Sequence, residues 1–309
     1  MVKMMLITLL FSSPIMMSSM ESWIMIWVLL EISSISFITI MKEKYKNDGI
    51  LLYFLAQAVG SLMLLFSVIQ NGMIMSGTII TGFMVTLGLM IKLGLIPFHQ
   101  WYVLLGMEME LINLLMMMTI QKIAPLILMT WIMNNFNLLL FLLMSMSMAL
   151  FIQMTQKFMK KLFIYSSIFQ TSWVVMLMLL SSPLAMIYFC IYSVIMTMIT
   201  YSMMNFSMEM MVEEKVSMVF MINMASLSGI PPLLGFIPKW VISKVMIKEE
   251  MLSPLLVIMM ITSTISIFIY MRFFFKMWMK HKNQFKFNEN LVPTMIIQLI
   301  SPISLFMLM

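Results

Sequence analysis

Long runs of apolar residues, separated by short polar or turn-rich stretches, follow one another along the whole chain. Most runs extend for about 20 residues, the length that a helix needs to cross the hydrocarbon core of a bilayer. The runs show no alternation of apolar and polar residues, so they predict helices and not the strands of a membrane barrel. Turn residues and charges divide the chain into about eleven such segments: 3–19, 22–41, 50–70, 74–105, 110–133, 137–155, 162–180, 183–206, 214–247, 253–275 and 291–308.

Two of these segments, 74–105 and 214–247, are too long for one straight span and contain both Pro and Gly. We therefore expect a broken helix in each half of the chain. Paired breaks of this kind are typical of transporters built from inverted repeats. The pattern predicts an all-α polytopic membrane protein with a single transmembrane domain over residues 1–309, whose two halves cover about 1–135 and 136–309.

The composition agrees with a membrane protein. Hydrophobic residues make up 62% of the 309 positions and charged residues 10%, whereas a soluble domain is about half apolar and a quarter charged. The single cysteine, Cys190, cannot form an internal disulfide, and no Cys or His cluster has metal-ligand spacing. We therefore expect no metal, haem, iron–sulfur cluster or other cofactor on this chain. The 48 methionines favour a genetic code that reads an additional codon as Met, as in animal mitochondria.

The basic residues indicate the orientation of the chain. Only Lys244 and Lys248 lie on one predicted side of the membrane. The positive-inside rule then places the N-terminus on the matrix or cytoplasmic side. The net charge of +6 is explained by this topology signal, so no nucleic-acid partner is needed. The thirteen basic residues on the N-terminal side are Lys3, Lys42, Lys44, Lys46, Lys157, Lys160, Lys161, Lys215, Arg272, Lys276, Lys280, Lys282 and Lys286.

The three remaining lysines, Lys92, Lys122 and Lys239, lie inside predicted spans. Among the twelve carboxylates only Glu31, in "IWVLLEISSISFI", lies well inside a span. A charge at this depth costs about 3 kcal/mol or more, so such residues face a protein interior or a wet cavity. Because the pKa of a lysine responds readily to burial and to neighbouring charge, a lysine near a carboxylate can hold or release a proton. We interpret these four residues as candidates for proton translocation.

Prolines lie within one or two turns of each of these lysines. A proline has no N–H to donate, so Pro97 is expected to free the carbonyl of Leu93, and Pro125 that of Gln121. A freed carbonyl can bind a water molecule or an ammonium group, and irregular backbone at membrane depth is tolerated only where protein or water surrounds it. The candidate helix breaks are Pro97, Pro125, Pro231, Pro232 and Pro238.

Static roles also explain some of these residues. The lysines can instead extend toward the headgroups or pair permanently to hold helices together. His99, one or two turns from Lys92, is either a proton relay or a side chain that hydrogen-bonds a free carbonyl. Four further polar side chains either line a wet path or join helices; these are Gln57, Ser61, Tyr165 and Ser166.

Five stretches between residues 27 and 240 resemble the NADH-ubiquinone oxidoreductase chain 2 family, the antiporter-like membrane subunits of respiratory complex I. They are "WVLLEISSISFI", "LLYFLAQAVGS", "IKLGLIPFHQW", "TIQKIAPL" and "GIPPLLGFIPKW". The last three are specific when taken together. One departure is that Val103 and Leu104 follow Tyr102, where many relatives have a proline and an acid or asparagine. The C-terminal seventy residues carry no matching motif.

The resemblance implies that Glu31 and Lys92 form a glutamate–lysine pair, that Lys122 is the central lysine of a proton path, and that Lys239 is the terminal one. It also implies an antiporter fold shortened by three N-terminal helices, with its N-terminus on the matrix side of the mitochondrial inner membrane. The expected partners are lipid and other membrane subunits of complex I, including neighbouring antiporter-like subunits. NADH, flavin, iron–sulfur clusters and ubiquinone would be used elsewhere in the complex.

Two other functions are consistent with this sequence. The chain could be a subunit of a multisubunit cation/proton antiporter, which shares the fold, although the missing leading helices and the methionine content argue against this. It could also be a structural spacer that binds neighbouring subunits and lipid while other subunits pump. A Lys122→Met substitution separates pump from spacer, and the identity of copurifying subunits separates complex I from an antiporter.

Overall fold

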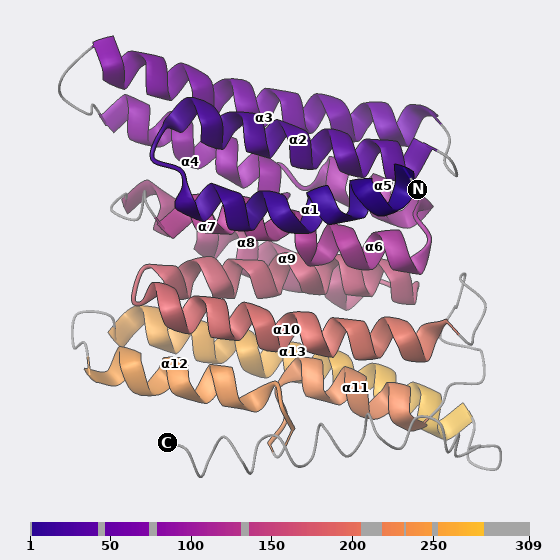
Figure 1. The fold of residues 1–309 in the computed structure, drawn as a ribbon. Helices are drawn as coiled ribbons and strands as arrows, with labels where there is room; N and C mark the ends of the chain where they lie inside the picture. Colours follow the sequence, from indigo (N-terminus) through magenta and orange to yellow (C-terminus); the bar gives the residue numbers. More distant parts are fainter. Residues whose placement is uncertain are drawn as a thin grey trace. The chain divides into compact units, whose positions relative to one another are not determined.

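All the elements that the computed structural model describes are helices (Figure 1). It describes residues 2–42, 47–73, 79–130, 136–204, 218–231, 233–248 and 253–280. Within these ranges the helices are α1 (Val2–Ser19), α2 (Trp23–Lys42), α3 (Asn47–Met73), α4 (Ile79–Leu93), α5 (Gln100–Glu108), α6 (Leu111–Met118), α7 (Ile120–Thr130), α8 (Phe136–Thr155), α9 (Met159–Met178), α10 (Ser182–Met203), α11 (Met218–Ser228), α12 (Phe236–Lys248) and α13 (Ser253–Lys280).

The described residues contain seven stretches long and apolar enough to cross a membrane. Three shorter apolar helices, Met4–Ser19, Thr81–Leu93 and Met218–Ser228, accompany them. The prediction of an all-α polytopic membrane protein is therefore confirmed. The expected segment 291–308 lies outside the described residues.

The two long segments predicted to be broken are each divided into two helices. α4 and α5 share the first, and α11 and α12 share the second. A third interruption, at Thr119 between α6 and α7, was not predicted. It carries neither Gly nor Pro, so its sequence has no helix-breaking signal. Each of the three interruptions lies close in sequence to one of the three lysines of the predicted spans, Lys92, Lys122 and Lys239.

Two compact units make up the chain. Unit 1 comprises residues 1–145 and 167–179, and unit 2 comprises residues 146–166 and 180–309. The expected division into two inverted halves near residue 135 stays a prediction. In unit 1, α3 packs along α4, and α2 contacts α1, α3 and α7. In unit 2, α11 contacts α10 and α13 (Figure 1).

Close backbone packing joins α3 to α4. A Cβ atom on Gly88 would lie 2.8 Å from the carbonyl oxygen of Gly60, and one on Gly60 would lie 2.9 Å from Cγ of Lys92. Small residues at such crossings let membrane helices approach closely. The crossing therefore holds the stem of Lys92 directly against the backbone of α3.

A buried polar cluster in unit 2 joins α8, α9 and α13. The side-chain amide of Gln153 donates a 3.1 Å hydrogen bond to the hydroxyl of Tyr270, which also hydrogen-bonds Ser166. Arg272 donates to the carbonyl of Met154. Gln153 and Ser166 are fully buried. These contacts between helices agree with the helix-joining interpretation of Ser166.

Candidate functional site

Glu31 and Lys92 both lie in unit 1 and are near enough for their charges to interact. Glu31 lies on α2 and is half-buried, and Lys92 lies in the last turn of α4 with 5% of its surface exposed. The two side chains interact through their charges. Oε1 of Glu31 is buried and has no hydrogen-bond partner among the described residues. The structure thus brings together the acid and the first lysine of the predicted pair.

The end of α4 is built around the backbone of Gly94, two residues after Lys92. Gly94 has φ +66°, and its N–H and that of Leu95 donate 3.1 Å bonds to the carbonyls of Ile91 and Met90. This pair of bonds is the Schellman arrangement that ends a helix at a glycine. The amide of Gln57 donates to the carbonyl of Lys92 at 3.4 Å. The carbonyls of Met90, Ile91 and Lys92 in this last turn therefore each accept a hydrogen bond.

Pro97 and His99 lie in the break between α4 and α5. Pro97 is exposed and comes after the helix has ended at Leu93, so the backbone leaves the helix at Gly94 and not at the proline. Nδ1 of His99 lies 3.2 Å from the carbonyl oxygen of Pro97. This contact agrees with the carbonyl-binding interpretation of His99, and its relay role stays a prediction.

Lys122 lies on α7 with 2% of its surface exposed. Its Nζ donates a 3.1 Å hydrogen bond to the carbonyl of Ser167 on α9 and lies 4.8 Å from the centre of the Tyr102 ring. The interruption of this segment is at Thr119, whose hydroxyl donates to the carbonyl of Leu115 at 2.7 Å. Pro125 is buried inside α7, which continues through it. The helix end beside Lys122 is therefore made by Thr119.

A polar chain extends from the surroundings of Glu31 toward α7. Tyr53 on α3 lies near Glu31. Its hydroxyl donates to Oε1 of Gln121 at 3.2 Å, and the Gln121 amide donates to the carbonyl of Ser33 at 3.4 Å. Gln121 directly precedes Lys122, so this chain ends at the helix that carries the central lysine.

Lys239 forms a separate site in unit 2. It lies on α12 with 7% of its surface exposed, and its Nζ donates a 2.7 Å hydrogen bond to the carbonyl of Ser228, the last residue of α11. Pro238 is buried in the first turn of α12, where a missing N–H is tolerated. Pro231 is exposed in the connecting turn, and Pro232 lies outside the described residues.

The sequence did not single out Tyr53, Tyr102, Gln121 or Ser167 as site residues. Tyr102 directly follows the "IKLGLIPFHQW" stretch, and Ser167 belongs to a run of hydroxyl and amide residues on α9. That run of polar residues within a membrane helix was the sequence feature that could have revealed Ser167 as a site residue. The Met159–Met178 span is the least hydrophobic of the seven, yet almost all of it is buried. A polar membrane helix that is sheltered from lipid is a place to look for partners of buried charges.

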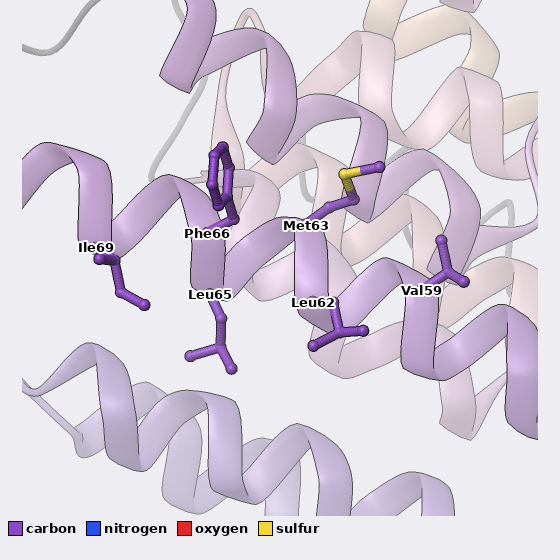
Figure 2. A pocket seen from close by; sticks show the side chains of 6 residues that line it. All are labelled: Val59, Leu62, Met63, Leu65, Phe66 and Ile69. Atoms are coloured by element: carbon purple, nitrogen blue, oxygen red, sulfur yellow. The ribbon is translucent and has the colours of Figure 1, made fainter.

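No group of three or more His, Cys, Asp or Glu side chains within the described ranges is placed to hold a metal ion. A hollow of about 480 Å³ lies along α3 (Figure 2). Its lining is entirely aliphatic or aromatic, so it suits hydrocarbon and not an ion. The lining residues are Val59, Leu62, Met63, Leu65, Phe66 and Ile69.

Comparison with known proteins gives a consistent set of relatives. Residues 20–266 match the model of the family described as NADH:quinone oxidoreductase/Mrp antiporter, transmembrane. NADH-ubiquinone oxidoreductase chain 2 of Anopheles gambiae is 30% identical over 306 residues, covering 92% of this chain and 89% of the relative. The chain 2 protein of Locusta migratoria is also 30% identical, over 96% of this chain and 94% of the relative.

Solved structures share the fold. A chain of respiratory complex I from Thermus thermophilus aligns with a TM-score of 0.73 and 21% identity, over 81% of this chain and 64% of that one. A chain of the Mrp complex from Dietzia sp. DQ12-45-1b aligns with a TM-score of 0.66 and 13% identity, over 85% of this chain and 56% of that one. This chain therefore spans somewhat less than two thirds of the length of both.

Proposed function

Because the chain belongs to the NADH:quinone oxidoreductase/Mrp antiporter family, and within it to the NADH-ubiquinone oxidoreductase chain 2 family, we propose that it is a proton-translocating membrane subunit of respiratory complex I. It contributes to the NADH:ubiquinone oxidoreductase activity of the assembled complex. Redox chemistry takes place on other subunits, and the charge changes there drive protons through this one.

One observation carries this proposal above all others. Lys92, Lys122 and Lys239 are almost completely buried in an apolar helical protein, and each lies near a helix end or interruption. A charge at membrane depth costs about 3 kcal/mol or more. Three such residues in one chain need a use that offsets this cost, and the transfer of protons is a use that needs ionisable groups at that depth.

The partners of Lys122 and Lys239 suit a group that changes its protonation state. Each Nζ donates to a neutral backbone carbonyl. Both an ammonium and a neutral amine can donate to a carbonyl, so these contacts survive the loss of a proton. A directly bonded carboxylate would instead favour the ammonium and hold the proton in place.

The charges of Glu31 and Lys92 give the first step of the proposed cycle. When the Glu31 carboxylate is ionised, it stabilises the ammonium form of Lys92, and when it is neutralised this support is lost. Within the described part of the chain, buried Oε1 of Glu31 has no hydrogen-bond partner, so this oxygen is available to accept a proton. Lys122 then acts as the central proton carrier and Lys239 as the terminal one. His99 is a further candidate relay.

We further propose that the chain lies in the mitochondrial inner membrane with its N-terminus on the matrix side. Its partners are lipid and other membrane subunits of complex I, including neighbouring antiporter-like subunits. The chain itself carries no cofactor, while the complex uses NADH, flavin, iron–sulfur clusters and ubiquinone on other subunits. The distribution of basic residues supports the orientation.

The alternative function is a subunit of a multisubunit cation/proton antiporter, supported by the likeness to the Mrp complex chain. Affinity purification of the tagged chain in mild detergent separates the two functions. We expect NADH-oxidising and iron–sulfur subunits to copurify in equal amounts with the chain. A purified complex that contains only antiporter chains and no NADH-oxidising subunit would reject the complex I assignment.

A further inference from the structure

Tyr102 is a buried residue of α5 that has no role in the proton path proposed above. It lies in the first turn of that helix with 1% of its surface exposed. The ring presents its face to Nζ of Lys122, 4.8 Å from the ring centre. The negative face of an aromatic ring attracts a cation, most strongly where water is excluded. Tyr102 therefore supports the charged form of Lys122 without a carboxylate.

The hydroxyl of Tyr102 closes a triangle with Lys122 and Ser167. It lies 2.8 Å from Oγ of Ser167, and the backbone carbonyl of the same serine accepts the 3.1 Å bond from Nζ of Lys122. The ring thus contacts the ammonium while its hydroxyl fixes the residue that carries the acceptor. All three residues belong to unit 1.

Tyr102 also touches the turn that ends the helix of Lys92. A Cβ atom on Gly94 would lie 2.9 Å from Cβ and Cγ of Tyr102, so the left-handed turn is pressed directly against this side chain. The neighbouring Trp101 donates through Nε1 to the carbonyl of Ile91 at 3.2 Å, and its ring lies 5.5 Å from that of Tyr102. The first turn of α5 is therefore joined to the last turn of α4 at two points.

From these contacts we propose that Tyr102 is a positioning residue that holds the Lys122 ammonium at the Ser167 carbonyl and links it to the helix end that carries Lys92. A movement of the α4 terminus reaches the Tyr102 ring through Gly94 and Trp101, and the ring then changes its distance from Lys122. This proposal rests on the proposed function for its purpose, since it describes how the first and central lysines influence each other. The position of the Lys122 side chain can be measured whether or not this residue transfers protons.

The effect of Tyr102 on the position of Lys122 is tested by solving the structure of the assembled complex with Tyr102→Leu and with Tyr102→Phe. We expect Nζ of Lys122 to leave the Ser167 carbonyl in the leucine variant, which has neither ring nor hydroxyl. We expect Nζ to stay there in the phenylalanine variant, which keeps the ring. A Lys122 side chain that is unmoved in the leucine variant would overturn the proposal, whatever the proton stoichiometry.

The functional content is tested by counting protons moved per NADH oxidised in vesicles that contain each variant complex. Tyr102→Leu is expected to show the same loss as Lys122→Met, and Tyr102→Phe to restore most of the parent ratio. Tyr201→Leu, at a tyrosine of α10 that is 53% exposed, is the matched control and is expected to keep the parent ratio. A parent ratio in Tyr102→Leu beside a lowered ratio in Lys122→Met would overturn the positioning role. If Lys122→Met moved as many protons per NADH as the parent, the proposed function would be rejected instead. The structures of the Tyr102→Leu and Tyr102→Phe complexes would still decide whether Tyr102 positions Lys122.

Discussion

Nζ of Lys239 donates a 2.7 Å hydrogen bond to the carbonyl oxygen of Ser228, the residue at which α11 ends. The C-terminus of a helix carries partial negative charge on its unbonded carbonyls, and a cation there is stabilised by about 0.3–2 kcal/mol. The break between α11 and α12 therefore supplies a backbone partner for a buried lysine. Lys122 also donates to a backbone carbonyl, that of Ser167, but this residue lies in the middle of α9 and not at a helix end.

Gly229, directly after Ser228, is required by this geometry. It has φ +83°, and a Cβ atom there would lie 3.0 Å from Cδ and 3.1 Å from Nζ of Lys239. Gly229→Ala should cost about 1–2 kcal/mol for the left-handed backbone and displace the lysine in addition. The measurement is the amount of assembled complex on a native gel together with its proton-to-electron ratio. A variant that assembles fully and pumps at the parent ratio would contradict the importance of this turn.

Glu31 and Lys92 should act as one functional unit. If each serves the same step, Glu31→Gln and Lys92→Met should each lower the proton-to-electron ratio, and the double variant should be no worse than the more severe single one. Groups that act together show such strong non-additivity, whereas independent sites add. Losses that multiply in the double variant would show that the two residues serve different steps.

The overall fold was predictable because its signals are local. Spans and the two long broken segments follow from apolar length and from Gly and Pro, and a lysine within an apolar run is visible in the sequence alone. The position of a break is less predictable: Pro97 is the conspicuous residue, yet Gly94 ends the helix, and Thr119 interrupts its segment with no sequence signal.

The partners of the buried charges were not predictable because they come from distant parts of the chain. Tyr102, Lys122 and Ser167 lie on three different helices, and periodicity within one helix says nothing of which neighbour a side chain meets. The pairing of Glu31 with Lys92 was implied by family resemblance, and in the structure the two residues are near enough for their charges to interact.

The polar cluster of unit 2 should be structural and not part of proton transfer. Tyr270→Phe removes the hydroxyl that accepts from Gln153, and it leaves a buried donor unpaired at a cost of about 1–3 kcal/mol. We expect less assembled complex and a lower melting temperature, with an unchanged proton-to-electron ratio in the complex that does assemble. Tyr201→Phe, at an exposed tyrosine, should change neither quantity. A lowered ratio in fully assembled Tyr270→Phe would place this cluster in the proton path.

The central claim is that a buried lysine passes protons, and Lys122→Met tests it most directly because methionine keeps the packing volume and removes the ionisable group. Removing a positioned acid–base group slows its step by about 100-fold or more, so this path should close. Lys157→Met, at an exposed lysine between α8 and α9, is the control.

The decisive measurement is the number of protons moved per NADH oxidised by the fully assembled Lys122→Met complex in sealed vesicles. If Lys122 passes protons, the ratio should fall below that of the parent and of Lys157→Met, at a level of assembly equal to theirs. An unchanged ratio in a fully assembled Lys122→Met complex would contradict proton transfer through Lys122. It would favour a structural spacer that binds neighbouring subunits and lipid while other subunits pump.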